Sequence, residues 1–252
     1  MSLGNATLAE LSKLSTLRGV SATLAATVLC AVGLTALFVA ETLHQSLVPH
    51  QLAASAAVDT ALRVIPYCQI GLIVLGSLTT ASEYDGWQIR TSLASVPKRA
   101  MLLTGKLIAY LTVAVPAALT TVGTAVVATE TALGGHRVPV GALCAAHNLL
   151  AMLGAASYLV LIGLLANAVA VLVRSFITTL VLVLTVVLVL SPALAAVTRL
   201  AAYLPERAGA LLYQSNPDTD GVLTPVQGAA VLGTWIVVLL SAAAVAFIAR
   251  DA

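Results

Sequence analysis

The sequence predicts an all-α membrane protein with six transmembrane helices, arranged as one membrane domain over residues 1–252. Hydrophobic residues make up 60% of the chain and charged residues only 9%, which is more apolar surface than a soluble domain of this size buries in its own core. Six long apolar runs fill most of the chain. The polar gaps between them are short, and none can hold a nucleotide-binding domain.

Each apolar run is long enough to cross about 30 Å of hydrocarbon as a helix. Helices are required because bare backbone polar groups are not tolerated in lipid. Pro66 opens the second run, and Pro116 lies inside the third, where we expect a kink. The predicted spans are 19–41, 61–81, 101–129, 147–173, 176–198 and 226–249. The glycines expected to allow close helix approach are Gly71, Gly76, Gly154 and Gly163.

The distribution of lysine and arginine predicts the orientation of these spans. With the N-terminus inside, eight of the 12 Lys and Arg residues lie at or near the inner face and four at the outer face. The positive-inside rule then places both termini in the cytoplasm. The net charge of +2 is too small to indicate a nucleic-acid partner. We therefore expect contact with membrane lipid and none with nucleic acid.

The N-terminal segment has the pattern of a short amphipathic helix lying on the inner membrane surface. Thr7 and Glu10 have the spacing of a capping box. Leucines recur at every third residue with charged side chains among them, which is typical of an interfacial helix. The alternative is an ordinary charged leader before the first span. The residues of this pattern are Leu8, Leu11, Lys13, Leu14, Leu17 and Arg18.

The gap after the second span, which begins SEYDGWQIRTSL at Ser82, predicts a short helix from about 83 to 95. Glu83 and Asp85 come before Arg90, so the acids sit at the positive end of the helix dipole. We expect this helix to dock on a cytoplasmic partner. The alternative is a tight loop with an interfacial tryptophan. The apolar contacts would come from Tyr84, Trp87 and Ile89.

The gap before the sixth span mixes leucine and tyrosine with charged residues, as in YLPERAGALLYQ at 203–214. It is too short to span the membrane and too apolar for a free loop. We expect one or two short helices that dip into the outer leaflet. The alternative is a simple surface loop.

A few polar residues lie within the spans and are candidates to line a pathway. Tyr67 and Gln69 fall on the second span, where structural packing is the alternative role. Asn167 on the fourth span is either a pathway residue or an interhelical hydrogen-bonding group. The histidines have no metal-site spacing, so no metal site is predicted. The three cysteines are expected to be buried small hydrophobes.

These segments resemble the permease subunits of ATP-binding-cassette (ABC) transporters, in the type 2 permease family found in bacterial exporters. The resemblance covers nearly the whole chain and rests on 10–19, 82–109 and 203–214. In the middle block, family members often carry Ser-Glu-Tyr, a glycine, Ile-Arg-Thr, a Pro-Lys-Arg and a lysine opening the next span. The sequence Asp85-Gly86-Trp87 departs from many relatives, which have smaller residues there. The matching residues are Ser82, Glu83, Tyr84, Gly86, Ile89, Arg90, Thr91, Pro97, Lys98, Arg99 and Lys106.

The resemblance implies a coupling helix from Glu83 to Leu93 that seats in a groove of a cytoplasmic ATPase subunit, with residues 8–18 as a connecting helix nearby. It also implies six spans, re-entrant helices before the last one, and a multi-pass protein of the bacterial cytoplasmic (inner) membrane. The coupling residues would be Glu83, Tyr84, Asp85, Gly86, Trp87, Ile89 and Arg90. Those of the interfacial helix would be Leu11, Lys13, Leu14 and Arg18.

The expected function is ATP-driven export of a hydrophobic or amphipathic substrate, such as a drug, an antibiotic or a lipid-like compound. The chain lacks the pattern G-x-x-x-x-G-K-[ST], so we expect no cofactor on it. ATP and Mg²⁺ would sit on two partner ATPase subunits, and a second permease copy or sister permease would complete the pathway.

Two other functional classes remain open. A six-helix secondary transporter or channel usually shows buried acids or inverted repeats. Here every Asp and Glu falls at a span end or in a gap. An intramembrane protease needs a nucleophilic serine in a glycine-flanked motif and a buried histidine. Gly76-Ser77 lacks that flanking pattern, and no histidine lies deep in a predicted span.

Overall fold

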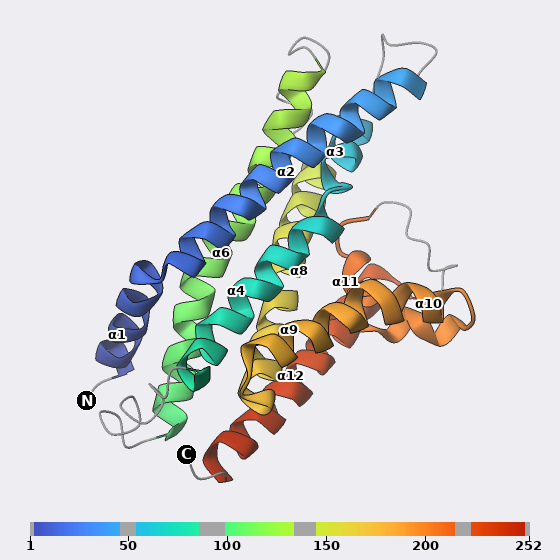
Figure 1. Ribbon diagram of the computed structural model, residues 1–252. Helices are drawn as coiled ribbons and strands as arrows, with labels where there is room; N and C mark the ends of the chain where they lie inside the picture. Colours follow the sequence, from blue (N-terminus) through green and yellow to red (C-terminus); the bar gives the residue numbers. More distant parts are fainter. Residues whose placement is uncertain (1–2, 46–53, 86–98, 134–144, 215–222, 250–252) are drawn as a thin grey trace.

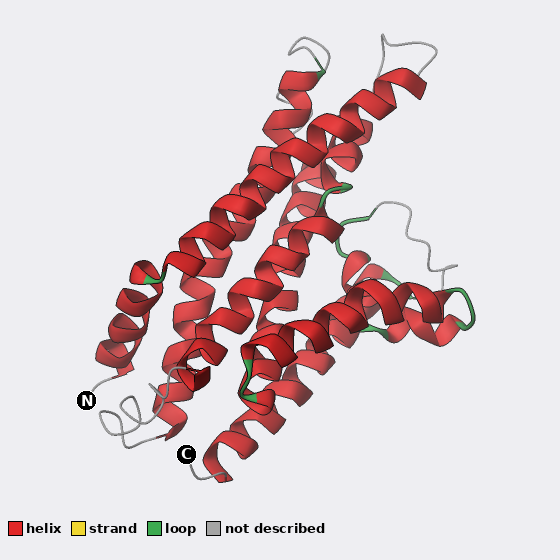
Figure 2. Cartoon of the chain, in the orientation of Figure 1, coloured by secondary structure: helices red, strands yellow, loops and turns green. Residues whose placement is uncertain are grey.

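The computed structural model describes residues 3–45, 54–85, 99–133, 145–214 and 223–249. All regular secondary structure in these ranges is helical (Figures 1 and 2). Five helices are long and apolar enough to cross a membrane, and they begin at Arg18, Met101, Ala146, Phe176 and Pro225. A shorter apolar helix covers Ile65–Ala81. The all-α prediction is therefore confirmed for the described residues, with five long apolar helices.

Two helices form the N-terminal part, α1 (Leu3–Thr16) and α2 (Arg18–Gln45), and they are separated at Leu17. The predicted capping box is wrong, because the chain is already helical at Leu3 and Thr7 lies inside α1. The Thr7 hydroxyl donates to the Gly4 carbonyl one turn earlier, at 2.8 Å. Glu10 is left to bond elsewhere in the molecule.

The second predicted span starts later than expected. Residues 61–62 belong to the short helix α3 (Ala54–Leu62), and α4 runs over Ile65–Asp85. Pro66 explains the break, because it has no N–H to donate and fits only the first turn of a helix. Backbone bonding resumes at Val64, whose carbonyl accepts from the N–H groups of Tyr67 and Cys68, each at 3.0 Å.

The third and fourth predicted spans correspond closely to α6 (Arg99–Ala132) and α8 (Ala146–Val173). Pro116 lies inside α6, whose helical assignment is continuous across it. The α8 helix ends at Arg174, which has a left-handed backbone (φ 59°) and donates its N–H to the Ala170 carbonyl at 2.9 Å. This cap turns the chain directly into the next helix.

The fifth predicted span changes its winding along its length. It consists of α9 (Phe176–Leu184), a π-helical stretch η1 (Thr185–Leu190) and α10 (Ser191–Ala195). The π turn precedes Pro192, which cannot donate to the carbonyl four residues earlier. The Ser191 N–H instead bonds to the Val186 carbonyl, five residues back. A wider turn thus accommodates the missing donor.

Two short helices precede the last long helix. The first, η2 (Arg199–Tyr203), is a 3₁₀ helix, and the second, α11 (Pro205–Ala210), is a short α-helix. The Thr198 side chain accepts a bond from the Leu200 N–H and so caps η2. The chain ends with α12 (Pro225–Ala249). Short helices were predicted in this gap, and they are present.

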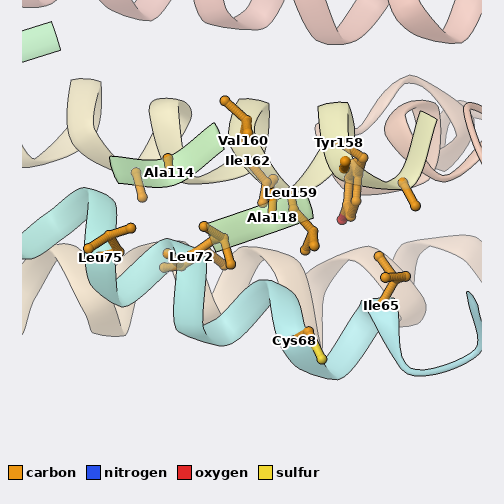
Figure 3. Packing of buried hydrophobic residues seen from close by; sticks show 14 of the residues in the cluster. Ile65, Cys68, Leu72, Leu75, Ala114, Ala118, Tyr158, Leu159, Val160 and Ile162 are labelled. Atoms are coloured by element: carbon orange, nitrogen blue, oxygen red, sulfur yellow. The ribbon is translucent and has the colours of Figure 1, made fainter. Parts of the chain in front are cut away.

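The core lies between α4 and α8, which form the largest helix–helix contact of the fold. Leu72 and Leu75 of α4, Ala114 and Ala118 of α6 and Ile162 of α8 belong to one buried cluster, which Figure 3 shows from close by. Glycines bring the backbones together: a Cβ at Gly76 would collide with the Gly163 carbonyl. The predicted role of the glycines in close approach is confirmed, since a Cβ on any of Gly71, Gly76, Gly154 and Gly163 would meet a neighbouring element in a clash.

The long helices run roughly side by side, so their ends gather at two ends of the molecule (Figure 1). The lower end in this view holds α1, the C-terminal end of α4, the N-terminal end of α6 and the C-terminal end of α12. The N-terminal helix and the two helix ends that flank residues 86–98 therefore lie at the same end of the bundle as the C-terminal end of α12.

Candidate functional site

A buried ion pair joins the N-terminal helix to the start of α6. Lys106 Nζ lies 3.1 Å from Glu10 Oε2, and the two side chains are 2% and 7% exposed. Lys13 Nζ lies 3.6 Å from the other carboxylate oxygen of Glu10, but its side chain is 38% exposed. Glu10 therefore holds α1 against α6 through the buried Lys106, whereas its pair with Lys13 lies within α1. Sequence reasoning missed this pair, although a lysine inside an apolar run was the signal for it.

The apolar side of α1 reinforces this contact. Leu14 is buried, and Leu11 and Leu17 pack against the core, whereas Leu8 is exposed. Arg18 is exposed at the first residue of α2. The predicted N-terminal helix is present, and one face of it packs on the bundle. Its position on a membrane surface stays a prediction.

The predicted coupling segment is only partly described. Glu83, Tyr84 and Asp85 form the last turn of α4 and do not start a separate helix. The apolar helix simply continues past Ala81 to Asp85 before the described residues end. Gly86, Trp87, Ile89 and Arg90 lie outside the described residues. The structure does position the two helices that flank this segment. The α4 helix ends just before it, and α6 begins just after it and contacts α1 (Figure 1).

Asn167 makes a buried polar contact between α8 and α4. Its Nδ2 donates to the Gly76 carbonyl at 3.1 Å, to Thr79 Oγ1 at 2.6 Å and to Thr80 Oγ1 at 3.0 Å. Asn167 is fully buried, and these acceptors around Nδ2 replace the water that its two N–H protons would otherwise need, while its Oδ1 has no hydrogen-bond partner among the described residues. This geometry is that of an interhelical hydrogen-bonding group, one of the two roles considered for it.

Gln69 and Tyr67, the other pathway candidates, point in different directions. Gln69 is fully buried, and its Oε1 accepts a hydrogen bond from the Tyr158 hydroxyl of α8. Tyr67 is 49% exposed. Its ring lies 6.0 Å from that of Phe38 on α2, measured between centroids. Gln69 and Asn167 are thus buried between α4 and α8, Tyr67 is exposed, and the role of the three as pathway residues stays a prediction.

A second polar cluster lies where α11 meets the bundle, and sequence reasoning did not single it out. Gln69 Nε2, Ser191 Oγ and Glu206 Oε2 are buried and have no partner at hydrogen-bonding distance among the described residues. Burial raises the pKa of Glu206, while the nearby Ser191, Arg207 and Gln69 side chains lower it less strongly. Burial also raises the pKa of the Tyr213 phenol, and the Glu206 carboxylate adds to that rise.

These features together define a class: a multi-pass helical protein, with helices long and apolar enough for a membrane and sparse polar contacts between them. Within the described residues, no group of His, Cys, Asp and Glu side chains could hold a metal ion. No protein-family model and no curated protein sequence matches the chain. Any narrower function therefore rests on the residues and their geometry.

Proposed function

We propose that the chain is the permease subunit of a bacterial ABC exporter, with six crossings and both termini in the cytoplasm. In this proposal α4 is the second crossing, although its apolar stretch of 17 residues (Ile65–Ala81) spans only about 25 Å. The short helices η2 and α11 are the re-entrant segments. The chain pairs with a second permease and with two ATPase subunits that carry ATP and Mg²⁺.

The observation that carries the proposal is the buried ion pair between Glu10 of α1 and Lys106 of α6. It joins the predicted connecting helix to the helix that follows the predicted coupling segment. A push on residues 86–98 would reach α4 at one side and α6 at the other. Because α1 is fixed to α6 by a desolvated charge pair, the three elements would move together, as mechanical coupling to an ATPase requires.

The placement of polar side chains inside the bundle and of apolar side chains on its surface also supports the proposal. Asn167, Gln69 and Lys106 are all buried inside the bundle, where polar groups of membrane helices are expected. The exposed surface of the long helices is apolar, with Leu29, Leu37 and Val245 among its most exposed residues. Such a surface is suited to lipid. The proposed substrate is a hydrophobic or amphipathic compound moved outward.

The experiment that tests the proposal is copurification with the soluble ATPase subunit encoded nearest to this chain. We expect Arg90→Glu to abolish copurification and substrate-stimulated ATP hydrolysis, because the charge reversal lies in the predicted docking helix. The matched control is Arg199→Glu in η2, which lies outside the predicted docking segment, and it should leave both copurification and ATP hydrolysis intact. Equal copurification of the two variants would contradict the assigned docking segment.

The orientation is tested separately. A single cysteine at Trp87→Cys should react with a membrane-impermeant maleimide only from the cytoplasmic side. The same reagent should reach Arg199→Cys only from outside. A reversed pattern would rule out docking of this segment on a cytoplasmic ATPase.

A further inference from the structure

A pocket of about 320 Å³ lies between α2, α4 and α6. Its wall includes Thr27 of α2, Gly71 of α4, and Thr112, Pro116 and Thr120 of α6. These residues lie well inside their helices and not at the ends, so the pocket is at membrane depth if the helices span the bilayer. Its volume is at the lower end of the range for small-molecule sites, about 300–1,000 Å³.

The polar groups of this pocket are threonine hydroxyls, and each of the three described next already donates its proton to a backbone carbonyl of its own helix. The Thr27 hydroxyl donates to the Thr23 carbonyl at 2.7 Å, and the Thr112 hydroxyl donates to the Ile108 carbonyl at 2.8 Å. The hydroxyl of Thr120 donates to the Ala117 carbonyl at 2.9 Å. Each hydroxyl oxygen keeps a lone pair that can still accept a hydrogen bond.

Pro116 adds a further acceptor. In a regular α-helix, the carbonyl of Thr112 would receive the N–H of residue 116, but proline has none. Thr112 and Pro116 both line the pocket, so the carbonyl that loses its regular donor belongs to a lining residue. The pocket therefore combines mainly apolar walls with acceptors, and no charged side chain of the described part of the chain contributes to its lining.

A ligand for such a site has to bring its own donor. A charged ammonium would lose its hydration without meeting an anion, which is costly in an apolar environment. A neutral hydroxyl needs only an acceptor oxygen. We infer that the pocket between α2, α4 and α6 binds a neutral apolar molecule carrying a hydroxyl group, through the acceptor oxygens around Thr112, Pro116 and Thr120.

Binding itself can be tested on this chain alone, whereas export of the bound molecule rests on the proposed function. The probe is a diazirine-bearing decanol, irradiated with the purified chain in lipid nanodiscs and mapped by peptide mass spectrometry. We expect labelling to concentrate on α2 and α6 around Thr27 and Thr112. Excess decanol should compete, and decane should not.

The matched variants are Thr120→Val and Thr131→Val. Both substitutions remove a hydroxyl from α6 and keep the size of the side chain. In the native chain both hydroxyls donate to the carbonyl three residues earlier. Only Thr120 lines the pocket. Losing one acceptor should weaken labelling about threefold to tenfold in Thr120→Val and leave Thr131→Val unchanged. Equal thermal unfolding of the two variants would show that both are folded.

Three results would overturn the inference: labelling spread evenly over the exposed faces of α12, equal competition by decane, or equal losses in the two variants. Because no ATPase is present, these results leave the proposed permease function untouched. Conversely, a chain that binds no ATPase but is labelled as expected retains the pocket and loses only the proposed role in export.

Discussion

Replacing Lys106 with methionine should release the N-terminal helix from the bundle. Lys106 is 2% exposed and lies 3.1 Å from Glu10, whose side chain is 7% exposed. Removing one partner of such a buried pair costs about 3–5 kcal/mol, because the Glu10 carboxylate stays buried and keeps only its weaker pair with the more exposed Lys13 at 3.6 Å. That cost disappears if α1 undocks and Glu10 becomes hydrated. At about 1.4 kcal/mol per factor of ten, the undocked fraction should rise about 100-fold or more.

Lys13→Met is the matched control, since Lys13 also pairs with Glu10. It does so at 3.6 Å and with 38% of its side chain exposed, so its loss should cost about 0–1 kcal/mol. The double variant Glu10→Met with Lys106→Met replaces the buried pair by apolar groups of similar size. Such replacements are often close to neutral, so this variant should keep α1 docked.

The assay is the rate of maleimide labelling at Leu14→Cys, in a background without the three natural cysteines. Leu14 is 5% exposed, so its cysteine reacts mainly when α1 undocks. We expect a fast rate with Lys106→Met, and slow rates with Lys13→Met and with the double variant. Equal rates for the two single lysine variants would refute the reasoning, because burial would then not decide the strength of the pair.

The remaining predictions concern packing, an internal hydrogen bond and pH. Gly163→Ala puts a Cβ against the Leu72 carbonyl and the Tyr110 hydroxyl, so it should lower the free energy of unfolding by about 1–3 kcal/mol. The control is Gly123→Ala, because a Cβ at Gly123 meets nothing within 4 Å. In the same thermal-unfolding assay this variant should be neutral or stabilising. Asn167→Ala should destabilise by about 1–2 kcal/mol through its lost interhelical bonds, and a large loss of transport at unchanged stability would instead assign it to a pathway. The pKa of Glu206 is raised in the folded chain above its ordinary value of 4.5, so the folded state binds this proton more tightly than the unfolded state. The contribution of Glu206 to the free energy of unfolding should be full below pH 4.5 and should fall as the pH rises through the folded-state pKa. Glu206→Gln should flatten that part of the profile of stability against pH. An unchanged profile would show that the carboxyl is not buried.

The boundaries of the long helices follow from the sequence because they depend on local chemistry. Runs of apolar residues place the ends of α8 and α12 within one residue and those of α2 and α6 within four residues. The main departure is at Pro66, where α3 and α4 separate, and there too the cause is local, since proline lacks a donor. The N-terminal helix was expected, but its start was misplaced, because a Thr-x-x-Glu pattern also occurs inside helices.

The polar contacts of the bundle depend on positions far apart in the chain. Glu10 meets Lys106 across 96 residues, and Asn167 meets Gly76 across 91. Helices that are apolar on all sides carry no pattern that tells which face turns inward. The sequence therefore predicts that such polar groups need partners, but it does not name the partners.

What the sequence by itself determined is the all-helical, apolar character of the chain and the places of its long apolar helices, since both depend on composition and run length. Only the tertiary structure decided which polar side chains meet, where three helices leave a pocket, and that α1 is bound to α6. Those outcomes depend on how each helix is rotated and displaced against its neighbours, and packing among many residues at once sets that geometry.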